Sequence, residues 1–330
     1  MATASPPLLA VEDLQIRFHT LRGVVHALDG VSFEIARGES IGLVGETGCG
    51  KSITARAILR LVDPPGRITA GSIRFEGTEL LTLDRRAMRT IRGQKISMIM
   101  QEPKVSLNPV MRIGRQVAET LLIHDRSLSH RQAEAKARDM LGSVSIPDPA
   151  RMAQRYPHEL SGGMAQRVMI AMMLVTRPRL LIADEPTSAL DVTIQAQILD
   201  LMTDLIAEIG SSVLMISHDL AVVAETCDRV IVMYAGTVVE SGTVDAVLDE
   251  PSHPYTRGLL NTLPDQVDPD RPLQSIPGNV PSLLAPPVGC RFAPRCPEAG
   301  PRCRRETPAA YDVGAGHVAA CFLHADGGVA

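Results

Sequence analysis

A glycine-rich segment that ends in Lys-Ser is the first feature of the sequence that could do chemistry. Residues 45–52 read GETGCGKS, which fits the phosphate-loop spacing G-x-x-x-x-G-K-[ST] at every fixed position. In such a loop backbone N–H groups surround phosphates, and the helix that follows presents the positive end of its dipole. We expect Lys51 to reach the β- and γ-phosphates of a nucleotide and Ser52 to place its hydroxyl on Mg²⁺. The candidate nucleotide contacts are Gly45, Glu46, Thr47, Gly48, Cys49, Gly50, Lys51, Ser52 and Ile53.

A second chemical feature is an apolar run that ends in two carboxylates. Residues 180–185 read LLIADE, the pattern of a buried strand with acids at its tip. We expect Asp184 to hold Mg²⁺ through water and Glu185 to polarise an attacking water molecule. An apolar strand ending in acids is also a common surface turn. Because this one follows a phosphate loop in the same chain, the two features together predict a nucleoside triphosphatase.

These side chains need a sheet to position them. Residues 9–18 and 31–35 alternate apolar and polar side chains in the manner of strands, and 71–80 is predicted to form a hairpin with Gly77 in its turn. Residues 180–183 and 213–216 are continuous apolar runs separated by a helix, as in a parallel sheet with crossover helices. Helical spacing dominates from about 110 to 160. The prediction is an α/β fold with one nucleotide-binding unit and a helical insertion.

Composition limits the partners of this chain. It has 33 Lys and Arg against 37 Asp and Glu, a net charge of −4, with 3% aromatic residues and no Trp. A basic field and stacking aromatics are what nucleic-acid binding requires, so we expect no nucleic-acid partner. No apolar run of about 18 residues predicts a membrane span, and the first residues do not resemble a secretory signal. We therefore expect a reducing compartment. In such a compartment the six cysteines are interpreted as thiols or metal ligands in preference to disulfides.

Further motifs lie in a recognisable order around the two features. Residues 160–164 read LSGGM, Gln101 follows the apolar run ISMIM, SALD occupies 188–191, and His218 follows VLMIS. With the phosphate loop and the acidic strand, these motifs resemble the ATP-binding-cassette (ABC) ATPases over residues 8–245. Most ABC ATPases have Gln where this chain has Met164, but peptide-importer members commonly have Met.

The resemblance implies both a fold and a domain division. The fold is a P-loop NTPase ABC-type nucleotide-binding domain over 1–250, with a RecA-like parallel sheet core, an antiparallel β subdomain and a helical subdomain at about 105–165. Residues 251–330 are then a small Cys-rich C-terminal appendage.

The resemblance also implies residue roles. Two such domains pack head to tail, so that Ser161, Gly162 and Gly163 contact the γ-phosphate of the partner's ATP. Gln101 then contacts Mg²⁺ and the attacking water, and His218 hydrogen-bonds the γ-phosphate. Asp191 links the two sites. Phe18 is the candidate to stack on adenine, with a core aromatic as the alternative.

Two segments near the C-terminus narrow the resemblance. SHPYTRGLLNTLP at 252–264 and CRFAPRCP at 290–297 resemble the tail of oligopeptide and dipeptide importer ATPases, a subfamily that includes nickel importers. This implies peptide import through two transmembrane permease subunits. The family resemblance implies that the segment 102–110, which contains Pro103 and Pro109, docks on a short helix of the membrane subunit. It also implies a sister ABC ATPase, an extracytoplasmic solute-binding protein and a peripheral place on the cytoplasmic face of the inner membrane.

Three alternatives stay open from the sequence. The imported solute could be nickel or another small molecule, or the chain could be a non-transport ABC ATPase. It could also be a binding module with a degenerate ATPase, although Lys51, Asp184, Glu185 and His218 are all present.

Four cysteines form a separate candidate site. Cys290, Cys296, Cys303 and Cys321 have the spacing C-x5-C-x6-C-x17-C, which does not by itself identify a metal. A metal centre would help to fold a Pro- and Arg-rich segment of low apolar content. We expect a structural [4Fe–4S] cluster, which members of the resembled subfamily are associated with; Zn²⁺ and free or oxidised thiols are the alternatives.

Overall fold

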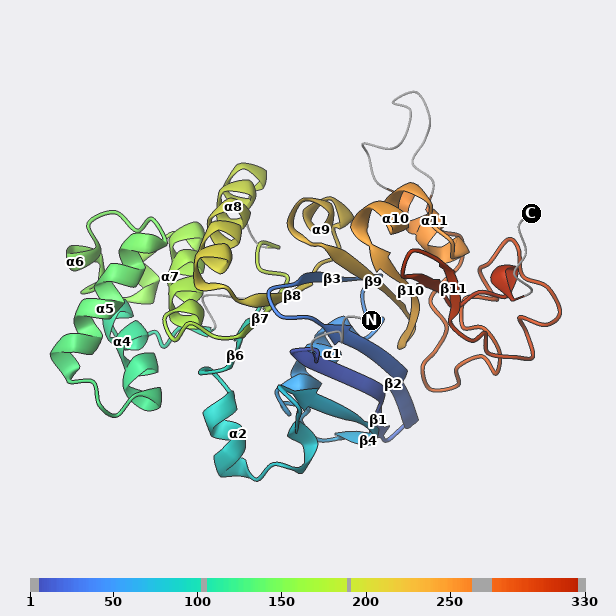
Figure 1. The fold of residues 1–330 in the computed structure, drawn as a ribbon, viewed down its shortest axis with the longest axis horizontal. Coiled ribbons are helices and arrows are strands. Elements are labelled where there is room, and N and C mark those ends of the chain that lie inside the picture. Colours follow the sequence, from blue (N-terminus) through green and yellow to red (C-terminus); the bar gives the residue numbers. More distant parts are fainter. Residues whose placement is uncertain (1–5, 102–105, 189–190, 263–274, 326–330) are drawn as a thin grey trace. The chain divides into compact units, whose positions relative to one another are not determined.

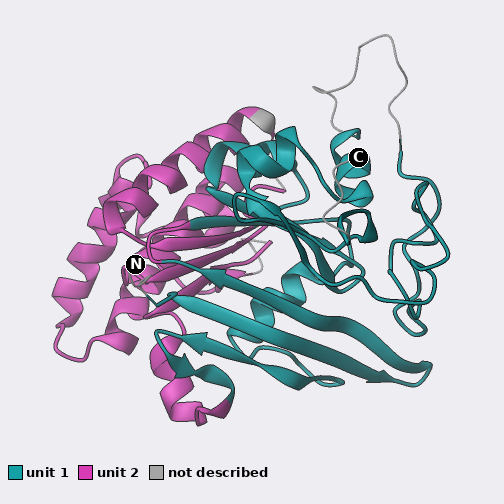
Figure 2. Ribbon diagram, turned by 45° about the vertical axis from the view of Figure 1, so that its right-hand side comes forward, with its two compact units in different colours: residues 1–36, 40–81, 216–330 teal, residues 37–39, 82–215 magenta. Residues whose placement is uncertain are grey.

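The computed structural model describes residues 6–101, 106–188, 191–262 and 275–325. The chain divides into two compact units (Figure 2). Unit 1 comprises residues 1–36, 40–81 and 216–330, and unit 2 comprises residues 37–39 and 82–215. Each unit therefore contains a different part of the predicted chemistry.

Unit 1 contains an antiparallel sheet with the strand order β2-β1-β4-β5 (Figure 1). Its strands are β1 (Leu9–Thr20), β2 (Gly23–Ile35), β4 (Gly66–Phe75) and β5 (Thr78–Glu79). The strands predicted at 9–18 and 31–35 lie in β1 and β2, and the hairpin predicted at 71–80 is formed by β4 and β5. Gly77 occupies the turn with φ 77°, a conformation that glycine adopts without strain.

The remaining strands of unit 1 have the order β11-β12-β10-β9-β3. They are β3 (Ser40–Val44), β9 (Arg229–Tyr234), β10 (Thr237–Thr243), β11 (Tyr311–Gly314) and β12 (His317–Ala319). β3 pairs with β9 in parallel, whereas β10 pairs antiparallel with both β9 and β12. The helices of unit 1 are α1 (Lys51–Ile58), α9 (Leu220–Thr226), α10 (Val244–Asp249) and α11 (Pro254–Leu260), with 3-10 turns η1 (Leu80–Thr82, the last residue in unit 2) and η4 (Phe322–His324).

The residues after 250, called here the C-terminal extension, share a core with the rest of unit 1. The buried cluster that contains Val232 and Tyr234 of β9 also contains Tyr255 of α11 and Phe292. The rings of Tyr234, Tyr255 and Phe292 pack with centroids 4.6–5.4 Å apart. Aromatic rings bury a large apolar area, so this cluster holds the described part of the extension against β9 and β10.

Unit 2 contains the strand order β8-β7-β6 and most of the helices. Its strands are β6 (Ile96–Ile99), β7 (Leu180–Asp184) and β8 (Ser212–Ile216, the last residue in unit 1). β6 and β7 pair in parallel, and every residue of β7 and β8 is buried, which explains why the sequence shows continuous apolar runs at 180–183 and 213–216. Both strand predictions are confirmed.

The predicted helical insertion is a group of helices in unit 2, in which α4, α5 and α7 pack against one another (Figure 1). The helices of unit 2 are α2 (Arg85–Ile91), α4 (Ile113–His124), α5 (His130–Ser143), α6 (Pro149–Met152), α7 (Gly162–Leu174) and α8 (Val192–Ile209), with a 3-10 turn η2 (Pro157–Glu159). In the part of the chain that the structure describes, no helix is both long and apolar enough to cross a bilayer.

Candidate functional site

The phosphate loop connects β3 to α1 in unit 1, as the sequence predicts. Gly45 has φ 143°, and a Cβ there would lie 2.1 Å from the carbonyl oxygen of Met233. Gly50 has φ 112° and caps the N-terminus of α1, where a Cβ would lie 2.5 Å from Leu28 Cδ2. A side chain at either position would disturb the loop, so the sequence requires glycine at both.

Lys51 is the first residue of α1 and is 6% exposed. Its Nζ donates hydrogen bonds to the carbonyl oxygens of Gly45, at 2.6 Å, and Glu46, at 3.2 Å. The ammonium group therefore lies against the loop that is predicted to bind phosphates. Burial raises the pKa of the neighbouring Cys49 thiol even though the charge of Lys51 opposes this. A protonated, buried thiol is poorly reactive, which favours a small structural residue over a redox switch.

Two further predicted residues lie in unit 1. Phe18 is half-buried on β1 and pairs with Gly66 of β4, where a Cβ would lie 2.7 Å from the Phe18 ring. The ring thus lies over a position that has no side chain, and adenine stacking stays a prediction. His218 is exposed in the turn that follows β8.

Unit 2 contains the two carboxylates that the sequence predicts to be catalytic. Asp184 is the last residue of β7 and is 7% exposed. Glu185 follows it with φ 48°, a left-handed backbone conformation that residues other than glycine rarely adopt. The side-chain amide of Gln101 donates a 2.8 Å hydrogen bond from Nε2 to Glu185 Oε2. The structure therefore brings together two of the predicted catalytic residues.

The predicted signature segment forms the start of α7. Ser161 is the exposed N-cap, and its side chain accepts a 3.3 Å hydrogen bond from Met164 N. Gly162 and Gly163 form the first turn, and a Cβ on Gly163 would lie 3.0 Å from Ile194 of α8. The helix therefore begins where the sequence places it, with its positive end at the signature.

Two predicted segments are only partly described. Asp191 caps α8 by accepting a 3.0 Å hydrogen bond from Ile194 N, but the preceding residues 189–190 of the SALD motif lie outside the described residues. In the predicted docking segment 102–110, residues 102–105, which include Pro103, also lie outside them, whereas Pro109 is exposed.

Comparison with known proteins decides the family. Residues 28–188 match the family model described as ABC transporter. The chain is 52% identical over 317 residues to a probable peptide ABC transporter ATP-binding protein of Sinorhizobium fredii, covering 96% of this chain and 94% of that protein. The chain belongs to the ABC transporter ATP-binding proteins.

Other relatives of this ABC ATPase agree. A dipeptide transport ATP-binding protein of Haemophilus influenzae is 46% identical over 307 residues, covering 93% of both chains. Residues 239–303 match the model for the C-terminal region of oligopeptide/dipeptide transporters. The solved dimer of the ATP-binding cassette MJ0796, bound to ADP and Pi, is 27% identical with a TM-score of 0.65, covering 72% of this chain and 98% of that one. The predicted ABC fold, ATPase class and peptide-transporter resemblance are confirmed.

The four cysteines of the C-terminal extension line one cavity. Its volume is about 220 Å³, and its walls include Phe292, Phe322 and Leu323. The cavity-lining thiols are Cys290, Cys296, Cys303 and Cys321. Among the residues that the structure describes, however, no three His, Cys, Asp or Glu side chains are grouped so that they could hold a metal ion. The structure therefore brings the predicted cysteines to one place but does not confirm a metal.

Two residues that the sequence motifs did not single out contact the phosphate loop. Arg295 forms an ion pair with the Glu46 carboxylate, and the Tyr255 hydroxyl accepts a 2.8 Å hydrogen bond from Glu46 N. Tyr255 lies in SHPYTRG and Arg295 lies in CRFAPRCP, the two segments that carry the subfamily resemblance. Both segments could therefore be singled out from the sequence, but only the structure shows that both contact Glu46.

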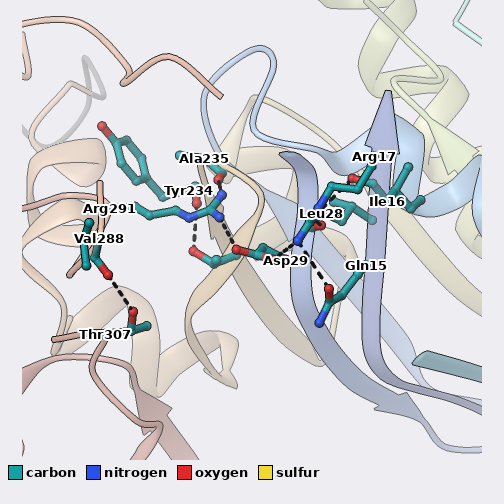
Figure 3. Close-up of polar contacts among 11 residues, drawn as sticks. Gln15, Ile16, Arg17, Leu28, Asp29, Tyr234, Ala235, Val288, Arg291 and Thr307 are labelled. Atoms are coloured by element: carbon teal, nitrogen blue, oxygen red, sulfur yellow. Dashed lines mark hydrogen bonds and ion pairs between the residues drawn. The ribbon is translucent and has the colours of Figure 1, made fainter. Parts of the chain in front are cut away.

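A second arginine of the C-terminal extension makes a similar contact elsewhere in unit 1. Arg291 donates to the Ala235 carbonyl and to the Asp29 carboxylate, which Arg17 also contacts from β1 (Figure 3). Burial by itself would raise the pKa of Asp29, but the Arg17 hydrogen bond and the charge of Arg291 outweigh burial and hold that pKa below its ordinary value.

Proposed function

We propose that this ABC ATPase couples ATP hydrolysis to the import of peptides through membrane permease subunits. The observation that supports the proposal is the joining, in one chain, of an ABC transporter match at residues 28–188 with a C-terminal region of the peptide-transporter type at residues 239–303. The relatives named as peptide and dipeptide transport proteins support the choice of solute.

The residues of this chain have separate tasks in hydrolysis. Lys51 and the backbone N–H groups of residues 45–53 bind the phosphates, and Ser52, Gln101 and Asp184 hold Mg²⁺, which neutralises phosphate charge. Glu185 accepts a proton from the attacking water, and its contact with Gln101 orients it. His218 hydrogen-bonds the terminal phosphate and Phe18 stacks on adenine.

A second cassette completes the proposed machine. Ser161, at the exposed start of α7, together with Gly162 and Gly163, binds the terminal phosphate of nucleotide on a partner cassette, and Asp191 links the two sites. The partner is a sister ABC ATPase. That the solved MJ0796 cassette is dimeric in its ADP- and Pi-bound state supports a paired arrangement.

The transporter contains two permease subunits, and the segment 102–110 docks on a short helix of the membrane subunit at the cytoplasmic face of the inner membrane. An extracytoplasmic solute-binding protein delivers the peptide. Val110, at the end of the segment 102–110, is 83% exposed.

The experiment is uptake by vesicles that contain the complete transporter and enclose ATP. We expect entry of a labelled dipeptide or oligopeptide, with loss of entry in Lys51→Ala. Nickel-63 in place of peptide tests the alternative solute. Nickel entry without peptide entry contradicts the peptide proposal. A chain that hydrolyses ATP normally but never associates with a permease contradicts the transport proposal.

We further propose that the four cysteines of the C-terminal extension hold a [4Fe–4S] cluster of structural role. Four thiolates are a ligand set for this cluster, and the apolar cavity would shield it from water. Burial raises the pKa of Cys321 to about 11, so the thiol releases a proton when it becomes a ligand.

Iron and sulfide analysis of anaerobically purified protein tests this second proposal. We expect about four irons for each chain, and loss of iron in Cys296→Ser. Cys227→Ser is the matched control, since Cys227 belongs to unit 1 but does not line the cavity. Zinc in place of iron, or equal iron in both variants, contradicts the proposal.

A further inference from the structure

Glu46 of the phosphate loop is held by the C-terminal extension at both its side chain and its backbone. Arg295 Nη1 lies 2.7 Å from Glu46 Oε2, and Arg295 Nη2 lies 3.1 Å from Oε1. This is the two-pronged geometry in which a guanidinium group binds a carboxylate most strongly. The Glu46 N–H donates to the Tyr255 hydroxyl at 2.8 Å. Two residues more than two hundred positions away in sequence thus hold one loop residue.

Arg295 is itself rigidly placed. Its side chain is 4% exposed, and its remaining N–H groups donate to the carbonyl oxygens of Pro277 and Ile276 and to the Tyr234 hydroxyl. An arginine with every donor used in a buried place has little freedom to move, because release would leave buried donors unsatisfied. The guanidinium group of Arg295 is therefore fixed in the orientation that binds both carboxylate oxygens of Glu46.

Tyr255 is placed with equal rigidity. It is fully buried, and its ring packs on Tyr234, with centroids 4.6 Å apart, and on Phe292, with centroids 5.4 Å apart. Packing against these two rings holds the Tyr255 hydroxyl toward Glu46. The tyrosine ring cannot turn away without breaking this aromatic packing.

Glu46 transmits this constraint to the residues that are proposed to bind phosphate. Its carbonyl oxygen accepts hydrogen bonds from Cys49 N at 3.2 Å and from Lys51 Nζ at 3.2 Å. Fixing Glu46 therefore fixes the start of a glycine-rich loop that would otherwise lose much conformational entropy when it wraps a ligand. When only a fraction of molecules has the binding conformation, the apparent Kd rises by the inverse of that fraction.

We propose that Tyr255 and Arg295 are positioning residues for nucleotide binding, which act through Glu46 to keep the phosphate loop in its binding conformation. This rests on the proposed function of the loop, and it gives the C-terminal extension a direct part in the ATP site of its own chain. Neither residue needs to touch the nucleotide.

The test is calorimetric titration of the full chain with MgADP, which avoids turnover, combined with steady-state ATP hydrolysis. Arg295→Ala is expected to raise the Kd about tenfold and Tyr255→Phe about threefold. KM for ATP rises in parallel, whereas kcat at saturating ATP stays within about twofold, because the loop is ordered once nucleotide is bound. Arg295→Lys, which keeps charge but not the fork, should fall between wild type and Arg295→Ala.

A double-mutant cycle separates positioning from general stability. If Arg295 acts through Glu46, Arg295→Ala should have no further effect on the Kd in a Glu46→Ala background. Arg257→Ala is the matched control, because Arg257 pairs with Glu298 in the same extension and should leave the Kd unchanged. Tyr255 contacts Glu46 from α11. Tyr255→Phe therefore removes a contact to Glu46 without a change beside the cysteines.

The outcomes are distinguishable. An unchanged Kd in Arg295→Ala and Tyr255→Phe beside a wild type that binds MgADP, with only a lower melting temperature, would overturn this inference alone. A wild type that shows no saturable binding would contradict the proposed function itself.

Discussion

The amide of Gln101 holds the carboxylate of Glu185 through a 2.8 Å hydrogen bond within unit 2. Glu185 has a left-handed backbone, φ 48°, and its carbonyl oxygen accepts a 3.3 Å hydrogen bond from Ser188 N, so a tight turn fixes the residue from the other side. Backbone strain of this kind costs about 1 kcal/mol or more and persists where the surrounding structure supports it, often at functional sites. The carboxylate is therefore oriented before any substrate arrives.

The first prediction concerns this orientation. Gln101→Ala should lower kcat about tenfold, because Glu185 would then sample orientations that cannot accept a proton. Steady-state ATP hydrolysis measures the effect. Gln154→Ala is the control in the same unit, since that side chain contacts Arg112 and not the carboxylates. Equal kcat values in the two variants would contradict an orienting role for Gln101.

The second prediction concerns the buried carboxylate of Glu240, which anchors the C-terminal extension. Glu240 is 1% exposed and accepts hydrogen bonds from Ser252 N at 2.6 Å, His253 N at 3.0 Å and His317 Nε2 at 2.7 Å. Glu240→Ala leaves these three donors without their acceptor. The substitution should therefore lower the free energy of unfolding by about 3 kcal/mol.

Urea denaturation of the full chain measures this loss. Glu12→Ala breaks a half-exposed ion pair with Arg74 and should cost less than about 1 kcal/mol. A loss in Glu240→Ala no larger than that control would show that the anchor contributes little.

The third prediction concerns pH and His253, which caps α11 by accepting a 3.0 Å hydrogen bond from Tyr255 N. Burial, with the charges of Arg257 and His324, lowers the pKa of His253 from 6.5 to about 3. Between pH 6.5 and about 3, His253 is therefore protonated in the unfolded chain but not in the folded chain. Stability should fall as pH drops from 6.5 toward 3, by up to about 1.4 kcal/mol per pH unit from this group.

His253→Asn keeps a capping acceptor without the titrating ring. It should be less stable than wild type near neutral pH, because ring packing on Phe292 is lost, but its stability should decline less steeply with acid. His19→Asn, at an exposed site, should keep the wild-type slope. Denaturation at several pH values decides, and parallel curves for all three proteins would refute the prediction.

The fourth prediction concerns Asp29, whose lowered pKa reflects Arg17 and Arg291 (Figure 3). A lowered carboxyl pKa stabilises the folded state above the unfolded value of 3.8, and this contribution is lost as pH falls further. Asp29→Asn should cost about 1 kcal/mol at neutral pH, since the site is a third exposed, and the difference from wild type should shrink below pH 3.8.

Melting curves of both proteins at neutral and acidic pH measure that difference. Asp312→Asn, an exposed site in β11, serves as the control and should have little effect at either pH. A difference that grows with acid would have the wrong sign for an ion pair.

The sequence predicted the parts of the site that are continuous in the chain. The phosphate loop, the acids at the end of β7 and the start of α7 at Gly162 each depend on neighbouring residues, so local spacing was sufficient. The strands at 180–183 and 213–216 were also predicted, because buried parallel strands leave an unbroken apolar run. The family resemblance added Gln101, and the structure shows its contact with Glu185.

Contacts between distant segments were not predictable in the same way. Arg295 and Glu46 are 249 positions apart, and no sequence pattern in either segment predicts a contact with the other. The C-terminal extension looked like a separate appendage because its composition changes at about residue 250. Yet Tyr255 and Phe292 join the core of unit 1, and β12 pairs with β10. The sequence singled out the four cysteines by their spacing, but the cavity that they line together depends on folding and not on that spacing.

The most direct test of the account is ATP turnover and nucleotide binding in Glu185→Gln. The variant keeps the size and hydrogen-bonding ability of the side chain but cannot accept the proton. Turnover should fall by about a hundredfold or more, while MgATP binding stays within about twofold of wild type. Wild-type turnover in Glu185→Gln would contradict the assignment of this carboxylate as the catalytic base.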